Sequence, residues 1–272
     1  MKEILTRSIT GAVFVAVILG SLWLGNWVSF LVMGLVGILG LHEFYTLKKN
    51  PLSGPTRWLS ILVGASSFFV YTGIALGMID VFFIPHAALI PVLLIFIAEI
   101  YRNKEHPLEN TSLSSIGWIY IMMPLFLLAF LASKDDLYAF SPLIITWTND
   151  TFAYLGGRLL GKKSLFPRIS PKKTWEGTLV GISFAILAGL IISLISETSL
   201  IFWIITAFLV SLASILGDLF ESLFKRSLQI KDSGNLLPGH GGILDRLDAT
   251  FFAVPLFYLL LTTAKHFNWI DF

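Results

Sequence analysis

The sequence contains no cysteine, and only 13% of its 272 residues are charged. The absence of cysteine excludes disulfide bonds, thiolate zinc sites and cysteine nucleophiles. The charged fraction is far below the roughly 25% that is typical of soluble domains. The formal net charge of +2 lacks the basic excess of a nucleic-acid-binding protein, so no nucleic-acid partner is expected.

Apolar residues take up 56% of the chain, and the mean hydropathy is +0.81. A soluble protein of this size would expose apolar patches larger than the few hundred Å² that soluble monomers tolerate. A bilayer core about 30 Å thick needs about 20 mostly apolar residues per helix. Candidate spans of that kind cover residues 8–25, 27–47, 58–78, 81–101, 115–132, 139–157, 177–196, 199–224 and 249–265.

The fold class predicted from these spans is an all-α integral membrane protein, a polytopic bundle of about nine transmembrane helices. We expect a single polytopic domain, residues 1–272, in which residues 1–135 form the N-terminal spans and residues 139–272 carry the candidate motifs. The first apolar run has no clean small-x-small cleavage site, so we interpret it as a retained span and not as a signal peptide.

The basic residues predict the orientation of the chain. With the loops numbered from the N-terminal tail as zero, every lysine and arginine except Lys134 and Lys265 falls on an even-numbered loop. Cytoplasmic loops carry an excess of these residues. We therefore expect the N-terminus and the even loops in the cytoplasm and the C-terminus outside, and the compact chain favours a bacterial inner membrane.

Acidic residues gather toward the cytoplasmic ends of several predicted spans, at Glu43, Glu99, Asp150, Asp218 and Glu221. Ionisable groups near the bilayer are costly and usually mark a functional site. A transporter would more often place them near the midplane. The pattern favours chemistry at the boundary between membrane and cytoplasm. The alternative is that acids at helix ends simply reach solvent.

The first candidate site covers residues 149–177, where six basic residues and several glycines lie between residues 158 and 173. Lysines and arginines neutralise phosphates, and glycines let backbone N–H groups approach them. Ser170 followed by Pro171 favours a helix start, whose N-terminus would attract an anion. The alternative is an ordinary cytoplasmic loop that holds anionic headgroups. The candidate residues here are Asp150, Ser170, Lys172, Lys173, Thr174 and Glu176.

The second candidate site covers residues 218–248. Asp245 and Asp248 are three residues apart and would share one face of a helix, while Asp218 approaches the same boundary from the eighth span. Three such carboxylates would form a hard-oxygen site suited to Mg²⁺. The alternative is a solvated loop in which the acids pair with neighbouring bases. The other candidates are Lys225, Arg226, Lys231, Asp232, His240, Gly241, Gly242 and Arg246, of which His240 could equally be a structural turn residue.

Residues 222–248 resemble the signature of the phosphatidate cytidylyltransferases, also called CDP-diacylglycerol synthases. The matching residues include Lys225-Arg226, Lys231-Asp232, His240-Gly241-Gly242, Asp245-Arg246 and Asp248, and residues 170–177 look like the family's second motif. The resemblance implies the reaction of CTP with phosphatidate to give CDP-diacylglycerol and pyrophosphate, with Mg²⁺ required. It implies CTP, phosphatidate and membrane lipid as partners and leaves a homo-oligomer open.

Under this hypothesis Mg²⁺ binds Asp218, Asp245 and Asp248, with room for a second cation. Lys172, Lys173, Lys225, Arg226 and Arg246 contact phosphates, and Asp150 is a further ligand or a neighbour of one. The alternatives are a CTP-dependent lipid or polyprenol kinase, which would transfer the γ-phosphoryl group, a transporter or scramblase, and a membrane scaffold.

Overall fold

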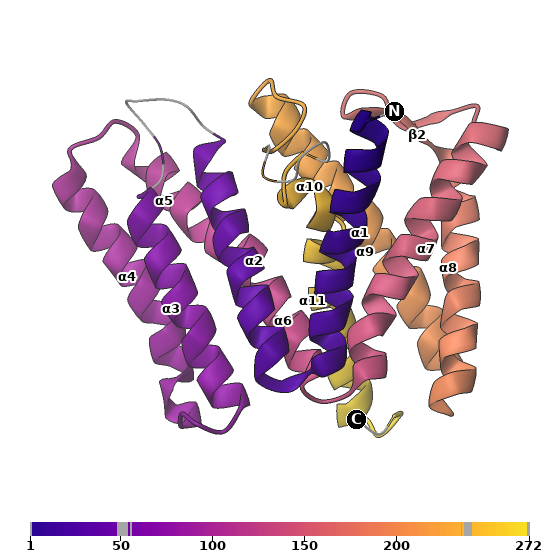
Figure 1. The fold of residues 1–272 in the computed structure, drawn as a ribbon, viewed down its shortest axis with the longest axis horizontal. Coiled ribbons are helices and arrows are strands. Elements are labelled where there is room, and N and C mark those ends of the chain that lie inside the picture. Colours follow the sequence, from indigo (N-terminus) through magenta and orange to yellow (C-terminus); the bar gives the residue numbers. More distant parts are fainter. Residues whose placement is uncertain (1, 48–53, 55, 235, 237–240, 271–272) are drawn as a thin grey trace. The chain divides into compact units, whose positions relative to one another are not determined.

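The computed structural model describes residues 2–47, 54, 56–234, 236 and 241–270. The regular secondary structure of the described chain is helical apart from one two-stranded hairpin (Figure 1). Its elements are α1 (Lys2–Leu24), α2 (Asn26–Thr46), α3 (Arg57–Ala75), η1 (Val81–Phe83), α4 (Ile84–Arg102), α5 (Pro107–Gly117), η2 (Trp118–Met122), α6 (Met123–Ala132), α7 (Asp136–Leu160), β1 (Ser164–Phe166), β2 (Ser170–Thr174), α8 (Trp175–Ser196), α9 (Leu200–Ser227), α10 (Leu244–Leu247) and α11 (Thr250–His266).

Within the described residues, seven helical segments are long and apolar enough to cross a membrane. They comprise α2, α3, η1 with α4, α5 through α6, α8, α9, and α10 with α11. The first and sixth predicted spans are also helical: α1 carries the shorter apolar segment Ile9–Leu24, and α7 is 25 residues long but contains several charged residues. The prediction of an all-α, polytopic membrane protein is therefore confirmed, and every predicted span falls on a helix.

The chain divides into two compact units. The first unit consists of Met1–Ser133 and Asp232–Arg246, and the second of Lys134–Lys231 and Leu247–Phe272. The residues of the second candidate site are therefore divided between the two units. Residues 232–246 belong to the first unit with the N-terminal helices, whereas the residues on either side of them belong to the second unit.

In the first unit, α2 packs closely on its neighbours because glycines line one side of it. A Cβ atom added at Gly34 would lie 3.0 Å from the ring of Phe68 on α3, and one added at Gly37 would overlap Met122 of η2. Small residues of this kind let helix backbones approach one another in a membrane. The contacts explain why α2 is buried along much of its length.

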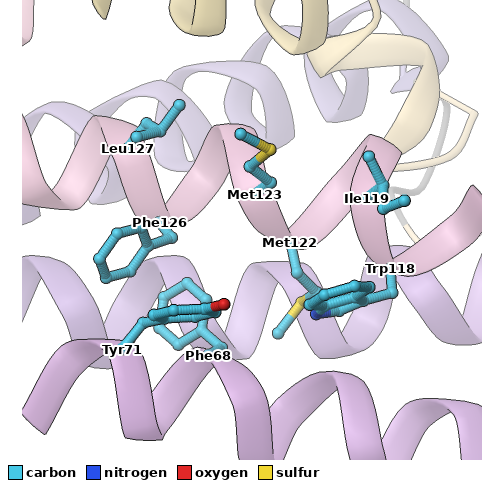
Figure 2. Close-up of a pocket in the computed structure, with 8 residues that line it drawn as sticks. All are labelled: Phe68, Tyr71, Trp118, Ile119, Met122, Met123, Phe126 and Leu127. Carbon is cyan, nitrogen blue, oxygen red and sulfur yellow. The ribbon is translucent and has the colours of Figure 1, made fainter. Parts of the chain in front are cut away.

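The span from α5 to α6 is interrupted by the π-helical turn η2. Pro124 follows this turn and has no N–H to donate to the preceding turn of helix, which accounts for the local change in winding. A cavity of about 270 Å³ lies beside the turn, and Figure 2 shows Phe68 and Tyr71 of α3 facing Met122 and Phe126 across it. Its lining is almost entirely apolar.

In the second unit, α7 and α8 lie side by side (Figure 1) and are in close contact. A Cβ atom added at Gly177 would lie 2.5 Å from the carbonyl oxygen of Ala153, and one added at Gly181 would lie 2.6 Å from that of Asn149. The glycines of α8 therefore allow direct backbone contact with α7. This close packing brings the start of α8 next to the polar residues of α7.

Trp203 of α9 anchors the opposite part of the second unit. It is fully buried, its ring stacks on Tyr138 of α7 with the centroids 6.2 Å apart, and Phe257 of α11 lies 6.1 Å away. Three helices that are distant in sequence thus meet around one aromatic side chain, which fixes α9 within the unit.

The prediction that a helix begins at Ser170 and Pro171 is wrong. These residues start strand β2, which pairs with β1 in an antiparallel hairpin, with Ser164 opposite Thr174. Helix α8 begins instead at Trp175, because the Thr174 side chain accepts a hydrogen bond from Gly177 N–H and caps the helix. Proline is tolerated in β2 because a two-stranded hairpin leaves an open edge.

Candidate active site

A polar pocket of about 420 Å³ opens in the second unit between α7, β2, the start of α8, and α9. The charged residues in its lining are Asp150, Arg158, Lys172, Lys173 and Asp218. Both predicted site regions therefore contribute to one pocket, the first through α7 and β2 and the second through α9. Asn149 and Arg158, which lie in the first candidate region but were given no role, also line it, as do Tyr154 and Thr178, which were not among the candidates from the sequence.

An ion pair connects these two regions. The Nζ of Lys173 lies 2.5 Å from Oδ2 of Asp218, and the two side chains are 26% and 33% exposed. The hydroxyl of Ser222, one turn further along α9, donates to Oδ1 of Asp218 at 3.3 Å. Both oxygens of the carboxylate are therefore held in place, while the side chain still reaches the pocket.

The hairpin and the start of α8 hold the two lysines at the pocket. The Glu176 carboxylate accepts hydrogen bonds from the backbone N–H groups of Lys162 and Lys163, at 3.0 and 3.3 Å. Together with the Thr174 cap, these bonds join the entry of the loop to its exit, so that Lys172 and Lys173 lie on a short, braced strand. Glu176 and Thr174 thus act on the position of the backbone, and Thr174 also lines the pocket.

Asn149 lines the pocket and is fully buried. Its Nδ2 donates to Oδ1 of the neighbouring Asp150 and to the hydroxyl of Ser214 on α9, both at 3.2 Å. Asn149 Oδ1 has no hydrogen-bond partner among the described residues. This oxygen lies against Gly181 of α8, where an added Cβ atom would come within 2.9 Å of it. The sequence signal for Asn149 was its position directly before Asp150 within a span.

A second cluster of acids lies along α9 and at the start of α11. Glu221 forms an ion pair with Lys225 at 2.5 Å, one turn apart on α9. The charges of Asp218 and Glu221 act on the carboxylate of Asp248, which also feels Lys225. Asp248 lies in the turn between α10 and α11, and its Oδ1 accepts a hydrogen bond from Ala249 N–H at 2.7 Å. Glu221 itself is buried within α9.

Asp245 belongs to the first unit. Its Oδ2 accepts hydrogen bonds from the backbone N–H groups of Ser233 and Gly242, at 3.0 and 2.9 Å. Gly241 has a φ of 81°, and a Cβ atom added there would lie 2.6 Å from this oxygen. The spacing of glycines in the signature therefore keeps the backbone close to Asp245, a reason for Gly241 and Gly242 that does not require contact with a substrate.

The remaining candidates are placed as follows. Arg226 and Lys231 are exposed in the second unit, and Asp232 and Arg246 are exposed in the first. Ser170 lies at the start of β2, outside the lining of the pocket. His240 falls outside the described residues.

Among the described residues, no group of three or more histidines, cysteines, aspartates and glutamates is arranged to hold a metal ion. Mg²⁺ is usually bound through one or two carboxylates together with waters and substrate phosphates, so a cage made wholly by the protein is not required. The paired acids at Asp218 and Asp248 provide hard oxygen donors of the right kind, and the assignment of Asp218, Asp245 and Asp248 as metal ligands stays a prediction.

The chain is similar to known proteins along nearly all of its length. Residues 5–264 match the profile of the Cytidylyltransferase family. A phosphatidate cytidylyltransferase of Bacillus subtilis is 32% identical, over 96% of this chain and 98% of its own length. Proteins with the same name from Rickettsia bellii and Staphylococcus haemolyticus are 38% and 42% identical over 62% and 59% of this chain, covering 78% and 60% of their own lengths. The chain therefore belongs to the cytidylyltransferase family.

Proposed function

We propose that the protein transfers the cytidylyl group of CTP to phosphatidate, forming CDP-diacylglycerol and pyrophosphate for phospholipid biosynthesis. The observation that supports this most is the polar pocket of the second unit, where Lys172 and Lys173 of one motif meet Asp218 of the other. The relatives named phosphatidate cytidylyltransferase indicate the substrates. A pocket that is basic and acidic at once suits two phosphate substrates and a divalent cation.

The chemistry needs positioning more than it needs a general base. The phosphate monoester of phosphatidate has a second pKa of about 6 and is largely ionised near neutral pH. One of its oxygens attacks the α-phosphorus of CTP, the bond from that phosphorus to the oxygen bridging to the β-phosphate breaks, and pyrophosphate leaves with the bonding electrons. Two anions have to meet in line, so charge neutralisation governs the rate.

The basic residues of the pocket are placed for that task. Lys172, Lys173 and Arg158 line it together and would neutralise phosphate oxygens. Lys173 already pairs with Asp218, and phosphate binding would compete for its charge. The N-terminus of α8, which begins directly after Thr174, adds a favourable field for an anion. Lys225, Arg226 and Arg246 are assigned to phosphates on the strength of the family resemblance.

Mg²⁺ is the proposed cofactor, with Asp218 and Asp248 of the second unit as candidate ligands. The family motif adds Asp245 as a further candidate ligand, and a second cation is a further hypothesis. Bound there, the ion would neutralise charge on the phosphates and on the pyrophosphate leaving group. The negative charges of Asp218 and Glu221 both act on the Asp248 carboxylate, and a cation bound beside Asp248 would offset them, which supports this assignment.

The site is proposed to face the cytoplasm, where CTP is found. The basic residues of the predicted even loops support this orientation, with the N-terminus inside and the C-terminus outside. The bacterial origin of the relatives supports the bacterial cell membrane as the location.

The test is an assay of the purified protein in detergent with phosphatidate, Mg²⁺ and CTP labelled at either the α- or the γ-phosphate. The proposal predicts that the α-label enters the lipid fraction and that the γ-label is released in pyrophosphate. Transfer of the γ-label to lipid, with release of CDP, would instead identify a lipid kinase. EDTA should abolish the transfer, and excess Mg²⁺ should restore it.

A further inference from the structure

Glu43 of α2 is a carboxylate buried inside the first unit, 3% exposed. Its Oε2 accepts a hydrogen bond from the backbone N–H of Ile243 at 2.9 Å, and its Oε1 accepts one from that of Leu244 at 3.2 Å. The hydroxyl of Ser233 donates to the same Oε1. All three donors belong to residues 232–246, the part of the signature that packs with the N-terminal helices.

The backbone of this segment is fitted closely around the carboxylate. A Cβ atom added at Gly234 would lie 2.8 Å from Cδ of Glu43, and one added at Gly242 would overlap Oε1. Two of the signature's small residues are therefore small because Glu43 occupies the space beside them. The alternative that an acid at the end of a span simply reaches solvent is wrong for Glu43.

The same segment holds Asp245 from its other side. Ser233 donates its hydroxyl to Glu43 and its backbone N–H to Asp245, and Gly242 touches Glu43 and donates its N–H to Asp245. Each of these two residues thus connects the two carboxylates. If Glu43 lost its bonds, the support of the Asp245 carboxylate would loosen with the backbone that carries it.

We propose that Glu43 is a positioning residue, which fixes Ser233 and residues 242–244 on α2 and thereby holds the backbone that supports the Asp245 carboxylate. This role rests on the proposed function for its catalytic consequence, whereas the anchoring itself does not. Burying a carboxylate in a membrane span costs free energy. Three hydrogen bonds from one distant segment offset that cost, and they do so only when this segment is in place. Glu43 touches neither substrate nor metal in this account.

The test uses Glu43→Gln, which keeps the shape of the side chain but turns one acceptor into a donor. Both carboxylate oxygens accept a backbone N–H, so the amide nitrogen must face a donor whichever way it is turned. The matched control is Glu99→Gln. Glu99 is also a buried acid of the first unit, and its hydrogen bonds to described residues go to Arg102 and Asn110.

The first measurement needs no activity. The chain lacks cysteine, so a single Leu236→Cys, at a side chain 45% exposed, can carry a nitroxide spin label within the segment. We expect Glu43→Gln to increase the mobility of the label in its spectrum and Glu99→Gln to leave it unchanged. Equal label mobility in the parent and in Glu43→Gln would overturn the anchoring.

The second measurement is steady-state kinetics of cytidylyl transfer in folded samples with matched thermal stability. We expect kcat to fall about tenfold or more in Glu43→Gln, because the backbone that supports Asp245 would shift and a misplacement near 1 Å can cost about 100-fold in rate. We expect a smaller change in KM for CTP and little effect in Glu99→Gln. Ser233→Ala keeps both backbone bonds and should fall between the parent and Glu43→Gln, which keeps the test open if the glutamine variant does not fold. Equal losses of kcat in Glu43→Gln and Glu99→Gln would show that Glu43 has only a general structural role, which would contradict the positioning role. A parent protein without transfer activity would reject the proposed function and leave the spin-label result standing.

Discussion

Gly177 is a position where a single added methyl group should displace an element of the candidate site. In Gly177→Ala the new Cβ would lie 2.5 Å from the carbonyl oxygen of Ala153 and 2.8 Å from both N and Cα of Gly157. All of these are backbone atoms of α7, so no change of rotamer can relieve the overlap. The first turn of α8 would have to move away from α7.

The size of this effect follows from the distances. Restoring an ordinary contact of about 3.5 Å requires a separation of about 1 Å. Overpacking of this kind typically costs about 1–3 kcal/mol, and at about 2–4 °C per kcal/mol the Tm should fall by about 2–12 °C. Displacements near 1 Å in supporting elements can lower turnover by about 100-fold. Because the first turn of α8 follows Lys173 and Thr174 directly, we expect a loss of that order in kcat/KM.

The assay is thermal unfolding in detergent at a fixed heating rate, followed by cytidylyl transfer below the transition. Gly20→Ala is the control, because Gly20 lies within α1 and a Cβ atom there would meet nothing within 4 Å. That variant should unfold at or slightly above the parent temperature, since alanine favours helix. If Gly177→Ala matched Gly20→Ala in both Tm and activity, the close contact between α7 and α8 would be refuted.

Three further predictions follow from the same site. Lys173→Met should lower kcat/KM about 10- to 100-fold, since a charge-assisted contact to phosphate contributes about 1.5–3 kcal/mol; an unchanged kcat/KM would remove Lys173 from the site. Asp245→Asn and Asp248→Asn should each lose turnover while inserting and unfolding like the parent, and substantial turnover in both would contradict the metal assignment. For topology, Arg168→Cys should resist an impermeant thiol reagent added outside intact cells, whereas Asp136→Cys should react; the reverse pattern would overturn the predicted orientation.

The spans could be predicted from the sequence because the hydropathy signal is summed over all the residues of a helix. A run of about 20 apolar residues has few other stable places to lie, and even α7, with Asn149 and Asp150 within it, is a helix. The hairpin of β1 and β2 could not be predicted in the same way. Its strands are only three and five residues long. In addition, Ser170 and Thr174 are both residue types that cap helix N-termini, so the residue types alone do not show which one caps the helix.

The part of the site that consists of charged residues within motifs could be predicted from the sequence. Lys172, Lys173, Asp150 and Asp218 were candidates, and the structure brings them to one pocket. Tyr154 and Thr178 were not, because they reach the pocket only through the packing of α7 against α8. Residues on two different helices that meet in the fold share no local sequence pattern, so their contact could not be predicted from the sequence.

The role of Glu43 was the hardest to predict. The sequence showed an acid at the end of a span, but its partners are about 200 residues further along the chain. The packing of Gly234 and Gly242 against Glu43 gives a reason for these two glycines that the sequence alone does not show. Such long-range pairing leaves no local periodicity from which it could be inferred.

The central claim is that the pocket of the second unit is where CTP and phosphatidate react. It is tested most directly by single-turnover transfer from α-labelled CTP in Asp218→Asn, beside the control Glu99→Gln. We predict that the label reaches the lipid fraction in the parent and in Glu99→Gln but falls by at least about 100-fold in Asp218→Asn, because the asparagine loses the charge that pairs with Lys173 and would bind Mg²⁺. Transfer at the parent rate by a folded Asp218→Asn protein would contradict the account.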